Sequence, residues 1–474
     1  MTSPDFVVVG SGPNGLVAAI DLLRAGHSVT VIEGRDTPGG GMRSGDLTAT
    51  GSIHDICATA FPMAMTSPAM ADIPLADLGV RWITPTAAAA HPLDEGRAAL
   101  TYQSIERTAA GLGHDAASYR RLLTPLVDQD VVDGALNLLS VPRNPVKMAR
   151  MGLAGLPPAN LLAKRFRTEE ARALFAGMAA HSMMKLSTPL TSAYGLTLNI
   201  FAHLTGWPIV EGGAGRLAEA LATHVIDLGG VIEIGRWVRD IDESPARYGT
   251  LFDTSAPALA DICGDRLSDR VSRQLRGLRR GPGVFKVDWL LDGPIPWTNA
   301  EVSTAATVHV GGTFEQIAAS EADANDGRHS EAPFVLLVQP NAFDPSRSAP
   351  GTHTIWSYCH VPNGSTVDMT EAMTRQIERF APGFRDRIVA TSTMGTQDYE
   401  AYNPNYLGGD INGGLADLIG LVRRPRWSTT PWRMPTPGVY LCSSSTPPGG
   451  GVHGMCGRHA ANAALADLRS GKLG

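Results

Sequence analysis

The chain has 474 residues, and 43% of them are hydrophobic, which is enough to fill the cores of two or three domains. Its 40 basic and 46 acidic side chains are spread along the sequence, so we expect no nucleic-acid partner. The five cysteines form no Cys-x-x-Cys pair, and glycines interrupt the first apolar run. We therefore expect a globular, cytoplasmic protein without a disulfide framework, signal peptide or membrane span.

The first 33 residues have the pattern of a nucleotide-binding β-turn-α-β unit. An apolar run, 6–9, leads into Gly10-Ser11-Gly12-Pro13-Asn14-Gly15, then a helical pattern as far as Gly26, a strand pattern and Glu33. The three glycines suit a tight turn, a backbone that approaches a pyrophosphate, and close packing of helix on strand. Glu33 is placed to accept hydrogen bonds from ribose hydroxyls. This acid disfavours a 2′-phosphate, so FAD or NAD is expected rather than NADP.

A second glycine-rich loop follows Glu33 directly, and it bears two arginines that are suited to a pyrophosphate or a ribose. We expect this loop to contact the same ligand through Gly34, Arg35, Gly40, Gly41, Met42 and Arg43.

Here the sequence resembles the FAD-dependent family of bacterial phytoene desaturases, retinol saturase and, more remotely, monoamine oxidases, which carry Glu-x-x-x-x-x-Gly-Gly-Arg at this point. Gly41 stands where the family has arginine, and Arg43 lies two residues further on. The resemblance extends to Glu211-Gly212-Gly213-Ala214-Gly215 and to the strand, loop and helix between 438 and 469. It implies non-covalent FAD as the cofactor. The further contacts that it implies are Val238 near the adenine and Ser444, Gly451, Val452, His453 and Met455 near the flavin.

The resemblance also implies an α/β fold: a Rossmann-type, glutathione-reductase-like FAD-binding domain with an inserted α+β substrate-binding domain. We expect residues 1–74, 206–282 and 432–474 to form the first domain, and residues 75–205 and 283–431 to form the second. Residues 75–205 have a mostly helical pattern. Three strand-like runs, 284–289, 334–338 and 354–358, predict an antiparallel sheet. We place the glycine-rich loop 403–414 near the flavin.

The sequence contains no second glycine fingerprint for a nicotinamide, no zinc-type histidine spacing and no Gly-x-Ser-x-Gly motif. We therefore expect no metal site, and chemistry that the flavin itself carries. The expected electron acceptor is oxygen, a quinone or a protein carrier rather than a nicotinamide.

Three side chains are candidates for the catalytic pocket. His453 is placed either to contact the flavin or to cap the following helix. Tyr194 and Trp356 are candidates for an aromatic substrate slot, although aromatic residues on strands are more often core. We expect Asp55 to be a structural hydrogen-bonding residue rather than a base.

The leading functional hypothesis is dehydrogenation or saturation of C–C bonds in a small apolar molecule, by hydride transfer with flavin N5. The alternatives are an amine oxidase acting on CH–NH bonds and a redox-neutral, flavin-dependent isomerase or binding protein. Residues 142–167 form a basic amphipathic stretch. This stretch predicts either a helical cap over the pocket or a peripheral membrane contact. The sequence leaves the oligomeric state open.

Overall fold

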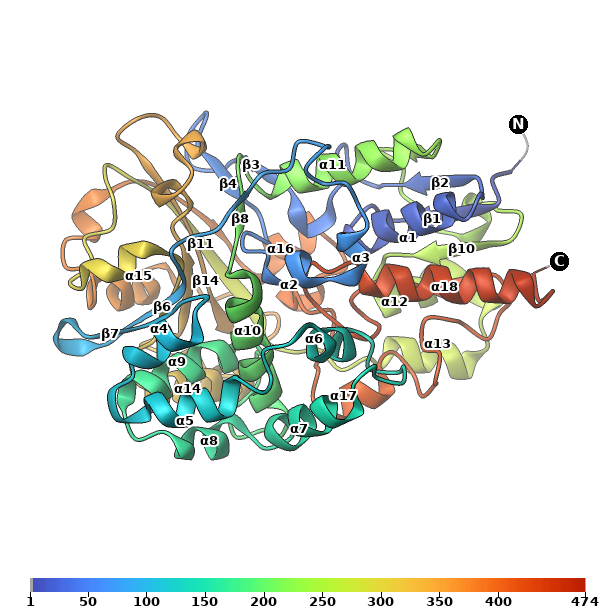
Figure 1. Ribbon diagram of the computed structural model, residues 1–474. Helices are drawn as coiled ribbons and strands as arrows, with labels where there is room; N and C mark the ends of the chain where they lie inside the picture. Colours follow the sequence, from blue (N-terminus) through green and yellow to red (C-terminus); the bar gives the residue numbers. More distant parts are fainter. Residues whose placement is uncertain (1–2, 474) are drawn as a thin grey trace.

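The computed structural model describes residues 3–473, and its first sheet is a five-stranded parallel sheet of Rossmann type (Figure 1). The strand order is β16-β10-β1-β2-β9, and all four pairings are parallel. The strands are β1 (Phe6–Val9), β2 (Val29–Ile32), β9 (Val231–Glu233), β10 (Gly249–Phe252) and β16 (Val439–Leu441). This arrangement confirms the expected α/β fold.

Helices cover both faces of this sheet, which explains why its central strand, β1, is apolar at every position. Phe6 and Val8 pack in the core that includes α1 (Pro13–Arg24), α11 (Ala214–Asp227) and α18 (Met455–Arg469). Val7 and Val9 point the other way, into the core that includes α12 (Ala256–Cys263) and α13 (Asp269–Arg276). Because alternate residues of a strand face opposite sides, a strand covered on both sides reads as a continuous apolar run.

The second sheet has seven strands in the order β15-β11-β14-β13-β12-β6-β7. They are β6 (Ala87–Pro92), β7 (Ala98–Thr101), β11 (Gly283–Leu291), β12 (Ala305–Val310), β13 (Val335–Val338), β14 (His353–Val361) and β15 (Ile388–Met394). The expected antiparallel sheet is present as β11, β14 and β13, while β12 and β6 pair in parallel. Apolar residues of one face, such as Leu337 and Ile355, pack in the same core as Met373 of α15 (Thr370–Glu378).

The expectation that residues 75–205 are mostly helical is wrong at their beginning. Residues 87–92 form β6, and residues 98–101 form β7. The run Ala87–Ala90 has weak strand propensity, but it lies buried in the sheet between β12 and β7. The α-helices of this segment are α4 (Ile105–Ala110), α5 (Ala116–Leu123), α6 (Gln129–Leu136), α7 (Pro145–Gly155), α8 (Ala159–Leu162), α9 (Glu169–Ala180) and α10 (Thr191–Thr205).

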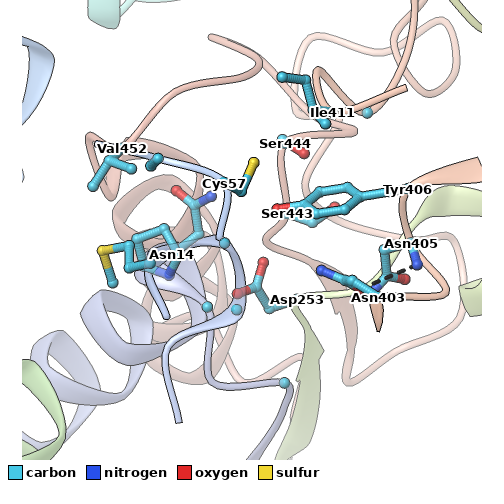
Figure 2. Close-up of a pocket in the computed structure, with 18 of the residues that line it drawn as sticks. Asn14, Cys57, Asp253, Asn403, Asn405, Tyr406, Ile411, Ser443, Ser444 and Val452 are labelled. Carbon is cyan, nitrogen blue, oxygen red and sulfur yellow. Dashed lines mark hydrogen bonds between the residues drawn. The ribbon is translucent and has the colours of Figure 1, made fainter. Parts of the chain in front are cut away.

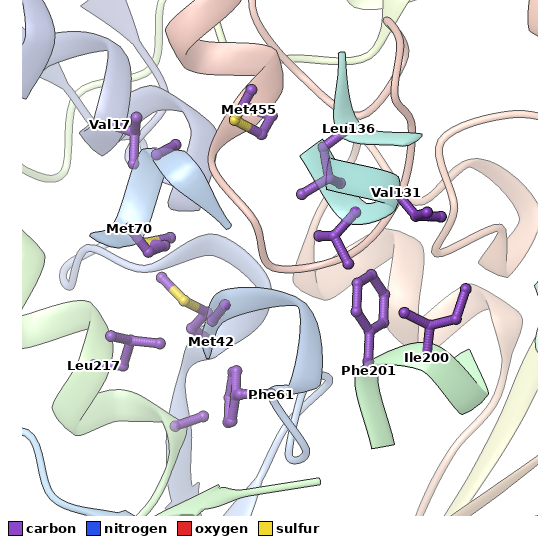
Figure 3. Packing of buried hydrophobic residues seen from close by; sticks show 14 of the residues in the cluster. Val17, Met42, Phe61, Met70, Val131, Leu136, Ile200, Phe201, Leu217 and Met455 are labelled. Atoms are coloured by element: carbon purple, nitrogen blue, oxygen red, sulfur yellow. The ribbon is translucent and has the colours of Figure 1, made fainter. Parts of the chain in front are cut away.

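The strands of the first sheet come from residues 6–32, 231–252 and 439–441, and those of the second from 87–101 and 283–394. The boundaries that we expect between a cofactor domain and a substrate domain stay a prediction. One apolar core joins the nucleotide unit to the helices of the 75–205 segment. Figure 3 shows Val17 of α1 and Met455 of α18 in the same cluster as Leu136 of α6 and Phe201 of α10. Within residues 3–473, the structure has no helix long and apolar enough to cross a bilayer.

Candidate active site

The loops that follow the five parallel strands open into one cavity of about 660 Å³. Gly10 follows β1, Glu33 follows β2, Val238 lies beyond β9, Asp253 follows β10, and Ser443 lies beyond β16. Each of these residues lines the cavity. In open α/β sheets, ligands bind at the carboxyl ends of the strands, because loop backbone and helix N-termini converge there. The cavity therefore lies where this fold binds a nucleotide.

The glycine-rich turn is packed so tightly that side chains would not fit. A Cβ on Gly15 would lie 2.3 Å from the carbonyl oxygen of Gly10, and a Cβ on Gly12 would lie 2.5 Å from the carboxylate of Asp253. Gly10 has φ +100°, in the region that favours glycine. Gly10, Gly12, Pro13 and Asn14 line the cavity. Gly15 lies behind them, where its missing side chain lets the helix approach the strand.

Glu33 lines the cavity, but its carboxylate is already engaged by the protein. Oε2 accepts hydrogen bonds from the backbone N–H and the hydroxyl of Ser11, and Oε1 accepts one from the backbone N–H of Arg35. Oε1 also lies 3.2 Å from the guanidinium of Arg43. A carboxylate has about four lone-pair sites. A ribose hydroxyl would therefore have to exchange with one of these partners, and the Ser11 hydroxyl is free to rotate.

The two arginines of the second loop have different surroundings. Arg35 lies between the rings of Trp237 and Tyr402, with its guanidinium carbon 5.7 and 5.9 Å from the ring centres. The same guanidinium donates to the backbone carbonyls of Ala401 and Tyr402. Arg43 is buried and donates to the carbonyls of Thr37 and Gly40, so it stiffens the loop as well as neutralising Glu33. Gly34, Gly40, Gly41 and Met42 line the cavity beside them.

The middle of the cavity lies between segments from distant parts of the sequence. Figure 2 shows Asn14 and Val452 on one side, with Tyr406 and Asn403 facing them. Cys57, on the segment after β4 (Ile53–Asp55), lies between these sides, and burial raises the pKa of its thiol to about 11. The expected contribution of the 403–414 loop is present, since residues 403–406 and 411–413 line the cavity.

The far end of the cavity is covered by one face of the seven-stranded sheet. Alternation along the strands brings Thr307 of β12, Leu336 and Val338 of β13, and Trp356 and Tyr358 of β14 to this face. His181, just after α9, and Trp207 complete this end. The surface is mostly apolar and aromatic, so it suits an apolar ligand.

Of the expected site residues, Val238, Trp356, Ser444, Gly451 and Val452 also line the cavity, while four lie outside its lining: Gly15, Tyr194, His453 and Met455. Met455 is the first residue of α18 and is buried in the apolar core. Tyr194 lies on α10, where its surroundings include the charges of Arg424 and Asp417, and burial raises the pKa of its phenol.

His453 is a structural residue in this arrangement. Its Nε2 lies 3.1 Å from the carbonyl oxygen of Gly449, and its Nδ1 accepts a hydrogen bond from the backbone N–H of Met455. Both ring nitrogens are therefore used to hold the loop against the start of α18. Burial lowers the pKa of His453 to about 4, so the ring is neutral. This side chain has the capping position that the sequence offered as one alternative, and its contact with the flavin stays a prediction.

Asp253 is a site residue that the sequence pattern did not single out. Its carboxylate accepts a hydrogen bond of 2.9 Å from the backbone N–H of Gly15, so it lies inside the glycine-rich turn. Burial and the nearby Glu33 raise the pKa of Asp253 to about 7. The available signal was an acid directly after the strand-like run 249–252, at the carboxyl end of a parallel strand.

A second group missed from sequence is a buried charge network behind the aromatic end. Lys286 and Asp288 are ion-paired on β11, and Asp288 lies 3.3 Å from Nδ1 of His54. The Lys286 ammonium is 6.0 Å from the ring centre of Trp356. The sequence signal was two opposite charges at alternate positions of an otherwise apolar strand.

Asp55 has the expected structural role, since its carboxylate accepts hydrogen bonds from Ser44, Thr59, Arg347 and the N-terminus of α11.

The comparisons with known proteins agree with this geometry. Residues 8–73 match the family model described as an NAD(P)-binding Rossmann-like domain. A mouse protein named pyridine nucleotide-disulfide oxidoreductase domain-containing protein 2 is 25% identical over 98% of this chain and 94% of its own length. Hydroxyneurosporene desaturase from Cereibacter sphaeroides is 26% identical over 98% of both chains. A solved structure of putrescine oxidase has the same fold, with a TM-score of 0.60, 15% identity and 99% coverage of both chains.

Over nearly its whole length the chain resembles the FAD-dependent oxidoreductases of the phytoene desaturase and amine oxidase superfamily. It is an oxidoreductase, and its Rossmann unit indicates a dinucleotide cofactor. No cluster of histidine, cysteine and acidic side chains within residues 3–473 is arranged to hold a metal ion.

Proposed function

We propose that the protein is an FAD-dependent oxidoreductase that dehydrogenates or saturates C–C bonds of a small apolar molecule. The observation that carries this proposal is the continuity of one cavity, which extends from the glycine-rich turn at Gly12 to the apolar sheet face at Trp356. A long dinucleotide placed along the turn would present its far end to that face. The desaturase named among the relatives supports a C–C bond as the site of reaction.

The residues along the cavity fit FAD. A pyrophosphate suits the bare backbone of Gly12 and Gly40, since a Cβ on Gly40 would lie only 2.9 Å from the Cα of Gly12. A ribose suits Glu33, and an adenine suits the segment of Trp237 and Val238. The isoalloxazine would then lie between the Cys57 segment and the loops of 403–413 and 443–452. We propose that FAD binds without a covalent bond.

When bound, the flavin would supply the hydride chemistry at N5. The chain itself would hold the substrate against that position and exclude water. Leu336, Val338 and Trp356 offer an apolar surface for the substrate, and Tyr358 and Tyr406 narrow the space beside it. We propose oxygen, a quinone or a protein carrier as the acceptor of the electrons.

An amine oxidase is the second candidate, because the fold is shared with putrescine oxidase. The positions of the acidic residues in the cavity do not favour an amine oxidase. The acids that line the described cavity are Glu33, Asp253 and Asp261, and all three belong to the nucleotide end. A cationic amine would find no carboxylate at the sheet face.

Anaerobic mixing of the FAD-loaded protein with substrates separates these candidates. We expect bleaching of the flavin absorbance by an apolar molecule with a C–C bond that can be desaturated, or reoxidation of the reduced flavin by its unsaturated counterpart. Bleaching by amines alone, with release of hydrogen peroxide in air, would assign the protein to the amine oxidases instead.

We also propose that the segment 142–167 contacts a membrane surface. Leu153, Leu156 and Leu161 are 80%, 52% and 53% exposed, respectively, on or just after α7 and on α8. Basic residues Arg150, Lys164 and Arg165 lie in the same segment. Exposed leucines flanked by basic side chains suit an interface with anionic lipid.

A further inference from the structure

Three histidines, of which His91 and His309 are buried and His181 is partly exposed, form a chain that ends at the sheet face of the cavity. His181 lines the cavity, and its Nε2 lies 2.9 Å from Nε2 of His309 on β12. Nδ1 of His309 in turn lies 3.4 Å from Nε2 of His91 on β6. Gly177 of α9 makes room for the inner rings, because a Cβ there would lie 2.6 Å from Nδ1 of His91. Each link joins one ring nitrogen to another.

All three rings are neutral at physiological pH. Burial lowers the pKa of His91 and of His181 to about 3, and burial together with the neighbouring rings lowers the pKa of His309 well below its usual value. A neutral imidazole carries one N–H and one lone pair. Because each nitrogen-to-nitrogen contact needs one hydrogen, the three N–H groups must all point the same way along the chain.

The surroundings of His91, at the inner end of the histidine chain, decide which way the three N–H groups point. Nδ1 of His91 is buried and has no hydrogen-bond partner within the described residues. A buried N–H without a partner is rarer in proteins than a buried acceptor without one. His91 therefore carries its hydrogen on Nε2 and donates to His309, and His309 donates from Nε2 to His181. This leaves the hydrogen of His181 on Nδ1, for which the described residues provide no hydrogen-bond partner.

Two other unpaired polar groups belong to the same surface. Nε1 of Trp356 and Oγ1 of Thr307 are buried without hydrogen-bond partners in the described part of the chain, and both residues line the cavity. An indole N–H is a donor only. The sheet face thus offers donors on an apolar surface, and the acids lining the cavity lie elsewhere.

We infer that the substrate is an apolar molecule that carries a carbonyl oxygen, and that His181 and Trp356 select it by donating hydrogen bonds. This inference rests on the proposed function, because it assigns the sheet face to the substrate. A pure hydrocarbon would leave these donors unpaired, which costs binding free energy. A cationic amine would bring a positive charge and further donors to groups that already donate.

A matched set of probes tests this inference by binding rather than turnover. FAD-loaded protein is titrated with 2-decalone, decalin and 2-aminodecalin, which share one carbon frame, and the flavin spectrum reports binding. We expect the ketone to bind about tenfold more tightly than the hydrocarbon. His181→Phe should reduce that preference to less than about threefold, since it keeps a ring and removes the donor. Equal binding of ketone and hydrocarbon, or a preference for the amine, would overturn the inference.

Two variants separate a lost donor from a disturbed fold. His181→Asn places an amide N–H near the position of Nδ1 and should keep most of the preference. Tyr194→Phe removes a polar group outside the cavity lining and should leave it unchanged. The FAD content of each variant is measured first, so that failure to bind FAD, which refutes the proposed function, is seen separately from failure to prefer the ketone.

The tautomer of His181 gives a test that needs no flavin. In protein with ¹⁵N-labelled histidine, long-range ¹H–¹⁵N spectra distinguish a ring protonated at Nδ1 from one protonated at Nε2, and His181→Phe assigns the signal. We expect His181 to be protonated at Nδ1. Protonation at Nε2 would reverse the chain and overturn the inference.

Discussion

Replacement of Asp253 by asparagine should strengthen FAD binding and remove its pH dependence near neutrality. The Asp253 carboxylate lies in the glycine-rich turn and accepts from the backbone N–H of Gly15. A bound pyrophosphate would bring negative charge to the same turn, so only the protonated acid is compatible with it. Asparagine keeps an oxygen that accepts from Gly15 and carries no charge.

The size of the effect follows from the pKa of Asp253, which burial raises to about 7. If the pyrophosphate keeps the carboxyl protonated up to pH 8, FAD binding takes up a proton above pH 7. Affinity then falls about tenfold from pH 6 to pH 8. The raised pKa also means that the folded apoprotein holds this proton more tightly than the unfolded chain does. The contribution of Asp253 to the free energy of unfolding is therefore present at about pH 4, and it is lost as the pH rises to about 7.

The assay is a fluorescence titration of the apoprotein with FAD at pH 6, 7 and 8. The wild type should lose about tenfold in affinity across this range, and Asp253→Asn should lose less than about twofold. Asp261→Asn is the charge-matched control, because Asp261 also lines the cavity but is exposed and paired with Arg276. A flat wild-type profile, or an asparagine variant as pH-dependent as the wild type, would refute the placement of the pyrophosphate beside Asp253.

Three further predictions test other parts of the site and surface. Glu33→Gln should weaken FAD binding by about tenfold or more, because a charged acceptor is lost; an unchanged dissociation constant would mean that the ribose does not use this acid. Neither NADH nor NADPH should bleach the flavin within seconds at sub-millimolar concentration, and rapid anaerobic bleaching by either would make the protein a reductase. Leu153→Ser combined with Leu161→Ser should reduce sedimentation with vesicles of anionic phospholipid, whereas wild-type protein that stays in the supernatant would exclude the proposed membrane contact.

The nucleotide end could be predicted in detail because its requirements are local. The spacing of Gly10, Gly12 and Gly15 after an apolar run predicts the tight turn between a strand and a helix. Glu33 follows at the end of the next strand. The turn, the helix and the parallel pairing all appear where the sequence indicated them. All of these features lie within the first 33 residues of the chain.

The sheet face could not be predicted in the same way, because distant strands assemble it. Thr307, His309 and His91 carry no local motif, and they meet through the register of β12 with β6 and the packing of α9. The alanine run of β6 even favours a helix when it is read alone. His453 shows a related limit: its position beside the helix start was predicted, but only the folded loop shows that both ring nitrogens contact the backbone.

The measurement that tests the central claim most directly is the identity and stoichiometry of the cofactor released on denaturation. The purified protein should be yellow, and acid or heat should release about one FAD per chain into the supernatant, where chromatography separates it from FMN and NAD. A colourless protein that cannot be reconstituted with FAD, or one that releases NAD instead, would contradict the account of this cavity as a flavin site.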